Sequence, residues 1–129
     1  MNKAILVTAA ILGLISVALG AFAAHGLENL VSSESIDSFQ TGVRYQMYYA
    51  ILLIIIGLSN YFSPKTKKTV YYLTLFGVIL FSGSIYGLST NDLSSFDFNS
   101  IALITPVGGL LLIGVWVILL ISFLKKAPS

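Results

Sequence analysis

The chain has 129 residues, enough for one domain, and 57% of them are hydrophobic while only 9% are charged. Soluble domains carry about 25% charged residues, so seven basic and five acidic side chains are too few to cover a water-facing surface. The composition also excludes disorder, which needs low hydrophobicity and high net charge. Without cysteine, disulfides and thiolate chemistry are excluded as well.

Four apolar stretches follow one another along the chain. They cover residues 4–24, 45–62, 70–88 and 101–124, and none contains Asp, Glu, Lys, Arg or His. As helices they would each span roughly 27 to 36 Å, about the hydrocarbon thickness of a bilayer. We therefore predict an all-α integral membrane four-helix bundle, a single transmembrane domain over residues 1–129. A soluble helical bundle is disfavoured because nothing is left to form its wet face.

The first stretch has a face of small residues at spacings of four, three, four and four: Ala9, Gly13, Ser16, Gly20 and Ala24. Close backbone approach joins helices in lipid, so we expect this face to be buried. A basic start and Ala21-Phe22-Ala23 also resemble a secretory signal. The apolar run exceeds the usual 7 to 15 residues of a signal, which favours a retained helix.

A candidate polar cluster lies where the first stretch ends and the second begins. His25 and Glu28 share one helix face if the first helix continues, and the entry to the second stretch carries Arg44, Gln46 and Tyr48. An ion pair between Glu28 and Arg44 is expected, with His25 and Gln46 nearby. This cluster either fastens the loop over residues 28–42 to the bundle or forms a small outward-facing polar site.

The third stretch contains Gly83 and Gly87 four residues apart, with Ser82 and Ser84 beside Gly83. The same reasoning predicts that this small face is buried in a helix contact. The contact is either within the bundle or between two copies of the chain.

The fourth stretch is interrupted by residues 105–109, TPVGG. Proline fits the first helical position, so Thr105 is a candidate N-cap and the spanning helix would cover residues 106–124. Residues 100–104 would then lie at the interface. The alternative is a continuous helix over residues 101–124 that is kinked at Pro106.

The distribution of cations predicts the orientation. Six of the seven basic residues lie at the start, between the second and third stretches, and in the tail: Lys3, Lys65, Lys67, Lys68, Lys125 and Lys126. The other two gaps hold all five acids, with Arg44 as their only cation. Because Lys and Arg in short loops stay cytoplasmic, we expect both termini inside the cell. The net charge of +2 is then a topology signal and does not indicate nucleic-acid binding.

Most catalytic chemistry is disfavoured. One histidine and no cysteine make a zinc or copper site improbable. Neither a phosphate-binding glycine loop nor a Gly-x-Ser-x-Gly motif occurs, and the apolar stretches hold no pair of carboxylates. We expect no enzyme activity and no cofactor.

Four motifs in order carry a resemblance that covers nearly the whole chain: GAFAAHGL at 20–27, FQTGVRYQMY at 39–48, LFSGSIY at 80–86 and TPVGG at 105–109. The sequence resembles the uncharacterised small inner-membrane family of YwdK and YgdD. The resemblance implies a four-helix protein of the bacterial plasma membrane with no established activity. Tyr49 stands where that family often has histidine, so a mechanism that needs two histidines is disfavoured.

Two function classes remain. The first is a non-enzymatic structural or accessory membrane component that binds lipid, a membrane-protein partner or a second copy of the chain. The alternative is a small transporter or channel with an uncharged groove at Ser82, Ser84, Tyr86, Thr105 and Pro106. Small multidrug exporters are expected to have an acidic residue in the first helix, and this chain has none there.

Overall fold

The computed structural model describes residues 2–91 and 102–125 and is all-α in these ranges. It contains α1 (Asn2–His25), the short 3₁₀ helix η1 (Leu27–Asn29), α2 (Ser33–Leu58), α3 (Pro64–Ser89) and α4 (Ile104–Lys125). Each of the four α-helices is long and apolar enough to cross a membrane. The predicted fold class is confirmed. Asp92, Asp97, Lys126 and residues 100–101 lie outside the described residues.

Two serine caps set where the middle helices begin. Ser32 Oγ accepts a hydrogen bond from the Ser35 amide at 3.2 Å, and Ser63 Oγ accepts one from the Thr66 amide at 3.2 Å. Each cap satisfies one of the free N–H groups of a first turn. Consequently α2 begins twelve residues before residue 45, and its polar start is helical although it is not part of the apolar stretch.

The start of α4 differs from both expectations, a helix that begins at Pro106 and a continuous helix from residue 101. Helix α4 begins at Ile104, and residues 102 and 103 form a turn. Thr105 is therefore a helical residue and not the N-cap, and no helix runs unbroken from residue 101. Pro106 lies within the first turn, where its missing N–H removes no intrahelical hydrogen bond.

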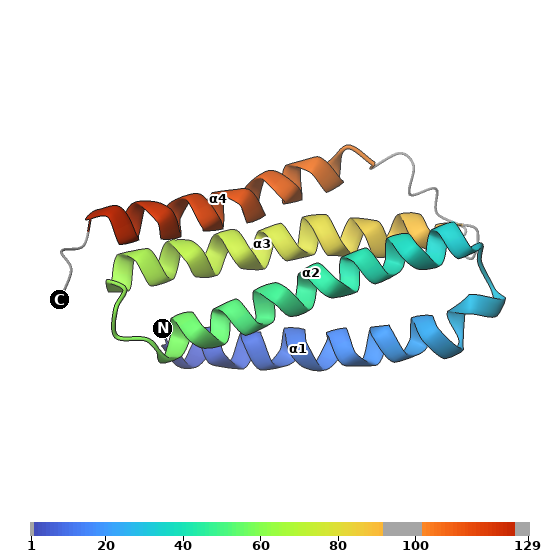
Figure 1. Ribbon diagram of the computed structural model, residues 1–129, viewed down its shortest axis with the longest axis horizontal. Coiled ribbons are helices and arrows are strands. Elements are labelled where there is room, and N and C mark those ends of the chain that lie inside the picture. Colours follow the sequence, from blue (N-terminus) through green and yellow to red (C-terminus); the bar gives the residue numbers. More distant parts are fainter. Residues whose placement is uncertain (1, 92–101, 126–129) are drawn as a thin grey trace.

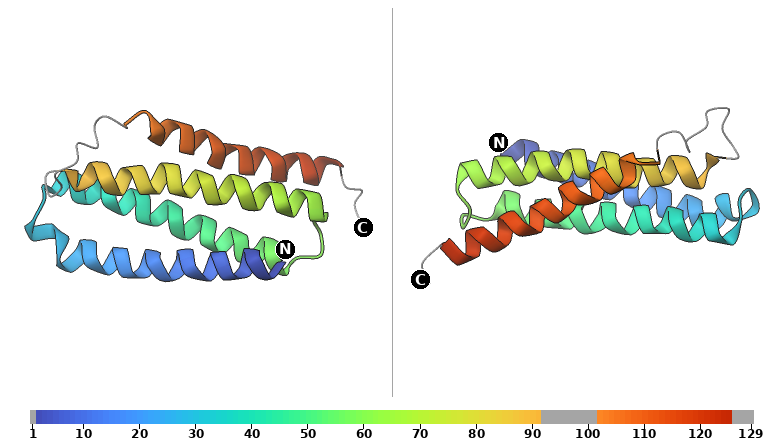
Figure 2. Two further views of the ribbon diagram at one scale, coloured as in Figure 1. Left: turned by 180° about the vertical axis from the view of Figure 1, so that it is seen from behind. Right: turned by 90° about the horizontal axis from the view of Figure 1, so that it is seen from above.

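The four α-helices run antiparallel in the order α1, α2, α3, α4 (Figure 1). Helix α1 packs mainly on α2 and α4 mainly on α3, while α2 and α3 form the central contact. Viewed from above, α4 crosses the others obliquely (Figure 2). The start of α1, the end of α4 and the α2–α3 connection lie at one end, here called the lysine end. The η1 turn lies at the other, the acidic end.

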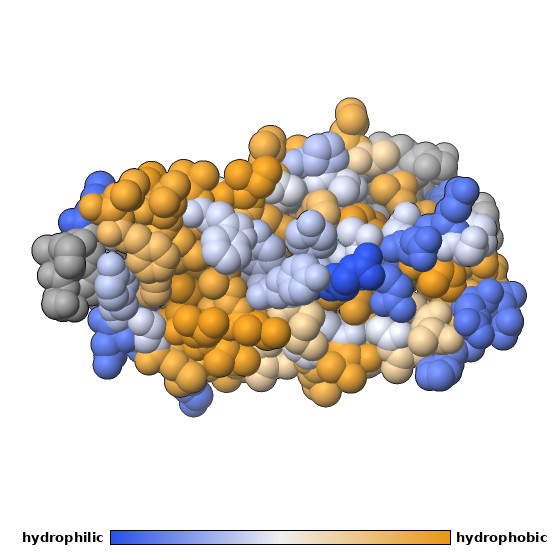
Figure 3. Space-filling view, viewed as in Figure 1, coloured by the Kyte–Doolittle hydropathy of each residue, from blue (hydrophilic) through white to orange (hydrophobic). Residues whose placement is uncertain are grey.

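Buried apolar side chains form two clusters. The larger joins all four α-helices through Ile5, Ala9, Tyr49, Leu53, Ile56, Val70, Val78, Leu112, Val115 and Leu119. The smaller lies at the acidic end and contains Ala23, Leu27, Phe39 and Val43. Many other large apolar side chains are exposed, among them Leu14 at 72% and Leu124 at 76%. Figure 3 shows hydrophobic side chains over much of one face, hydrophilic ones at both ends and a hydrophilic strip across the middle of that face. The large exposed apolar area suits a lipid-exposed exterior.

The small face of α1 packs on α2 for most of its length. Ala9 and Ser16 are buried. A Cβ added at Gly13 would lie 3.9 Å from Ala50 Cβ, and one at Gly20 would lie 3.5 Å from Val43. The expectation for Ala24 is wrong, because Ala24 is exposed and its neighbour Ala23 is buried instead.

Gly83 is not packed within the bundle, so the expected contact inside one chain is not formed there, and a contact between two copies stays a prediction. A Cβ added there would meet nothing within 4 Å, and Gly87 is only half-buried. Among the glycines whose surroundings the structure describes, the tightest contacts occur at four that the sequence did not single out for this role: Gly42, Gly57, Gly77 and Gly108. A Cβ on Gly108 would overlap the backbone nitrogen of Phe81 and lie 2.7 Å from the carbonyl carbon of Leu80. The backbones of α3 and α4 therefore meet at Gly108.

Candidate functional site

The predicted polar cluster is not brought together. His25 ends α1 and Glu28 lies in η1, and both are exposed. Arg44 lies about three turns into α2 and is exposed, and its Nη2 donates to Thr41 Oγ1 at 3.2 Å. Within residues 2–91 and 102–125 no ion pair joins Glu28 to Arg44. The reason is the early start of α2, which moves Arg44 away from the helix entry.

Gln46 is separate from that cluster and links three helices. It is 4% exposed. Its Nε2 donates to the Leu12 carbonyl at 2.9 Å, and its Oε1 accepts from Tyr86 Oη at 2.7 Å. Because the alternative in lipid is an unsatisfied polar group, such bonds favour one arrangement of α1, α2 and α3. Tyr48, two residues on, is exposed.

The predicted uncharged groove is filled by helix contacts. Ser82 Oγ donates to the Gly42 carbonyl at 2.8 Å, on the α2 side of α3. Ser84 points to the other side, where its hydroxyl is hydrogen-bonded to Thr105 of α4 and to the carbonyl of Leu80. Pro106 is exposed. These groups therefore join helices and do not line one open path.

An apolar lateral groove lies between α2 and α4. It has a volume of about 150 Å³ and is lined by Tyr45, Tyr48, Tyr49, Leu52 and Trp116. Tyr49 Oη donates to the Leu112 carbonyl at 2.9 Å, which fixes the ring at the base of the α2–α4 contact. Tyr49, at the position where the family often has histidine, thus joins α2 to α4 through this hydrogen bond.

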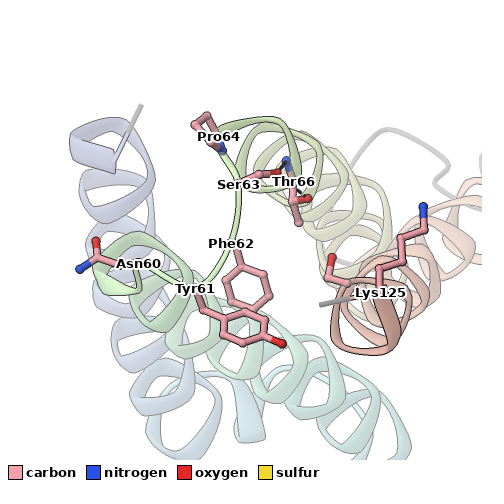
Figure 4. A pocket seen from close by; sticks show the side chains of 8 residues that line it. Asn60, Tyr61, Phe62, Ser63, Pro64, Thr66 and Lys125 are labelled. Atoms are coloured by element: carbon pink, nitrogen blue, oxygen red, sulfur yellow. Dashed lines mark hydrogen bonds between the residues drawn. The ribbon is translucent and has the colours of Figure 1, made fainter. Parts of the chain in front are cut away.

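The lysine end holds three polar hollows. The first, the loop hollow, measures about 540 Å³ and lies between the α2–α3 connection and the end of α4. In Figure 4, the Tyr61 and Phe62 rings extend from the connection into this space, opposite Lys125 of α4. Ser63, Thr66 and Ser122 add hydroxyl groups to its wall.

The other two hollows flank the loop hollow. The α3–α4 hollow, about 280 Å³, shares Thr66, Ser122 and Lys125 with it and adds Lys65, Thr69, Ile118 and Ile121. The Lys67 hollow, about 570 Å³, lies on the α1 side and is lined by Asn2, Lys3, Asn60, Phe62, Pro64 and Lys67. Sequence reasoning used these lysines only to assign orientation.

Lys67 is the buried one among the described lysines of this end. It is 6% exposed, and its Nζ donates to Asn2 Oδ1 at 3.1 Å. Among the described residues no carboxylate forms an ion pair with it, and the three described acids, Glu28, Glu34 and Asp37, lie at the acidic end, in η1 and the start of α2. An ammonium group has three N–H donors, so this neutral amide satisfies only part of its hydrogen-bonding capacity.

A fourth polar hollow lies at the acidic end. It measures about 300 Å³ and is lined by Ser32, Glu34, Ser35, Ser38, Ile85, Leu88 and Ser89. In the part of the chain that the structure describes, no three His, Cys, Asp or Glu side chains gather where they could hold a metal ion.

The comparisons with known proteins agree with this architecture. The family model described as "Protein of unknown function (DUF423)" matches residues 19–109. The chain belongs to this family. Among its relatives, the UPF0382 membrane protein SH2409 of Staphylococcus haemolyticus is 37% identical, over 95% of this chain and 97% of that protein. No solved structure matches the chain.

Two further DUF423 relatives bear the names met in the sequence resemblance. YwdK of Bacillus subtilis is 35% identical over 95% of this chain and 98% of its own length. The inner membrane protein YgdD of Escherichia coli is 34% identical over 96% of this chain and 92% of its own. The resemblance is confirmed, and this DUF423 protein is a multi-pass bacterial membrane protein of an uncharacterised family.

Proposed function

We propose that this DUF423 protein is a non-enzymatic accessory component of the bacterial plasma membrane that acts by binding lipid at its lysine end. The observation that carries the proposal is the pair of adjoining hollows beside α4, the loop hollow and the α3–α4 hollow. Their walls combine ammonium and hydroxyl groups with apolar side chains. A phospholipid presents the same combination, a polar headgroup joined to acyl chains.

The depth of these hollows supports the proposal. Lys65 and Lys125 lie at helix ends, where long cationic side chains reach the headgroup layer. Ile121 and Ile118 lie one and two turns before Lys125 on α4, in the apolar part of the helix. A headgroup held by the lysines would therefore leave its acyl chains beside apolar side chains. With the orientation predicted from the cations, this is the cytoplasmic leaflet.

Lipid retention after purification in detergent tests the proposal. Ser122 is half-buried and lines both hollows, so Ser122→Trp fills them. Leu124→Trp is the control, because Leu124 is 76% exposed on the same helix and lines neither hollow. We expect native mass spectrometry to find bound phospholipid on the wild type and on Leu124→Trp, and less on Ser122→Trp. A wild type that retains no lipid, or equal retention by the two variants, contradicts the proposal.

A further inference from the structure

We infer that the Lys67 hollow binds the phosphate group of an anionic phospholipid. The inference rests on the lipid binding proposed above and deepens it, because it names the chemical class of the lipid and a second position at the same end. The argument begins with the charge of Lys67 and its burial.

A buried ammonium group needs a compensating partner. Removing a charge from water costs several kcal/mol unless the charge is paired or fully hydrogen-bonded. Lys67 is 6% exposed, yet its only hydrogen bond within the described residues goes to the neutral Asn2 amide. The lysine lines a hollow of about 570 Å³, which is large enough to admit an anion that would compensate this charge.

The other groups that line the hollow favour a phosphate. Lys3 contributes a second cation, and the amide groups of Asn2 and Asn60 add hydrogen-bond donors. No acidic side chain lines this hollow. Phosphate oxygens accept charge-assisted hydrogen bonds from lysine, which are stronger than those between neutral groups.

The position of the hollow favours a lipid as the source of that phosphate. Val70 lies one turn beyond Lys67 on α3, and Ile5 lies just beyond Lys3 on α1; both are buried in the apolar body of the bundle. Phe62 and Pro64 supply an apolar wall. Basic pockets between transmembrane helices at the cytoplasmic side are suited to anionic headgroups, and a free phosphate would make no use of the apolar wall.

Lipid titration with a matched pair of variants tests the inference. Lys68 is the control for Lys67, since it is the next residue of α3, carries the same charge, is exposed and lines none of the three hollows. The full-length protein in dodecyl maltoside is titrated with phosphatidylglycerol or phosphatidylcholine, and the apparent Kd is read by native mass spectrometry. We expect phosphatidylglycerol to bind more tightly. Lys67→Gln should weaken it about tenfold, the loss of one charge-assisted hydrogen bond, while Lys68→Gln leaves it unchanged.

Lys67→Arg and Lys3→Gln keep the test decisive if Lys67→Gln does not fold. Arginine retains the charge and should retain tight binding, whereas Lys3→Gln should weaken it. Equal affinity for the two lipids, or equal losses in Lys67→Gln and Lys68→Gln, overturns the inference and leaves the proposed function standing. Absence of any bound lipid overturns both. Displacement of phosphatidylglycerol by millimolar inorganic phosphate or glycerol 3-phosphate would show that the hollow binds a free phosphate, and would overturn the assignment to a lipid.

Discussion

Gln46 and Tyr86 are held together inside the bundle, with Tyr86 Oη donating to Gln46 Oε1 at 2.7 Å. We expect Tyr86→Phe to lower the free energy of unfolding by about 0.5 to 1.7 kcal/mol, the range of interhelical hydrogen bonds in membranes. Gln46→Leu should cost more, because it also removes the bond to the Leu12 carbonyl. Equilibrium unfolding in mixed micelles of sodium dodecyl sulfate and dodecyl maltoside measures both.

The double variant separates the bond from other effects of the two substitutions. If the bond is formed, the combined loss is smaller than the sum of the single losses. Tyr72→Phe serves as the control, because Tyr72 is 43% exposed on the same helix. Strict additivity of the Gln46 and Tyr86 substitutions would show that no such bond stabilises the protein.

Two glycine substitutions should have opposite consequences. Gly108→Ala forces α4 away from the backbone of α3, and we expect a loss of about 1 to 3 kcal/mol in the free energy of unfolding, as for overpacked cores. Gly83→Ala meets no neighbour within 4 Å. It should be neutral or slightly stabilising, because alanine favours helix over glycine by about 0.5 to 1 kcal/mol. The same micellar unfolding measurement compares them.

An equal loss in the two glycine variants would contradict this expectation. It would mean that Gly83 contacts a second copy of the chain or another membrane protein. Sedimentation of the wild type and Gly83→Ala in density-matched detergent would then reveal a change in oligomeric state.

Arg44 and Glu28 should be energetically independent. Arg44 donates to Thr41 on its own helix, and Glu28 lies in η1. We expect the stability changes of Arg44→Ala and Glu28→Ala to add within about 0.3 to 0.5 kcal/mol, as for uncoupled sites. A thermal unfolding series of the two single variants and the double variant measures the coupling. A larger coupling energy would contradict this expectation and support the ion pair between Glu28 and Arg44 that the sequence suggested.

The orientation of the bundle can be measured directly because the chain has no cysteine. Ser33→Cys places a thiol at the start of α2, at the acidic end, and Asn60→Cys places one at the lysine end; both positions are exposed. A membrane-impermeant maleimide should label Ser33→Cys in intact spheroplasts and Asn60→Cys only after lysis. The reverse pattern would place the lysine end outside.

The sequence predicted the spans well but not the contacts between them. Hydropathy locates the apolar part of each helix because lipid excludes charge, yet it missed the start of α2, which Ser32 caps in a polar segment. Helix rotation was harder. In water the apolar face of a helix marks the core, whereas in lipid both the inner and outer faces are apolar. Gly83 and Gly108 therefore looked alike in the sequence, and only the second is packed.

The candidate site was predicted less well, for a related reason. Gln46 and Arg44 are two residues apart and both polar, but a step of about 200° turns one inward and the other outward. Nothing in one sequence fixes which of them is buried. Likewise Lys67 and Lys68 were equivalent as topology signals, and the hydrogen-bond partner of Lys67 is Asn2, which is distant in the sequence.

The main packing of the chain is between consecutive helices, α1 on α2 and α4 on α3. Each hairpin can therefore close as soon as its second helix leaves the translocon, without waiting for a distant segment to be synthesised. One of the contacts between the two hairpins is made by the Gln46 carboxamide, which meets Tyr86 only after α3 has entered the membrane. During biosynthesis the Gln46 Nε2 group can bond to the Leu12 carbonyl within the first hairpin, whereas its Oε1 atom accepts from Tyr86 only when the second hairpin docks. This second bond favours association of the two hairpins.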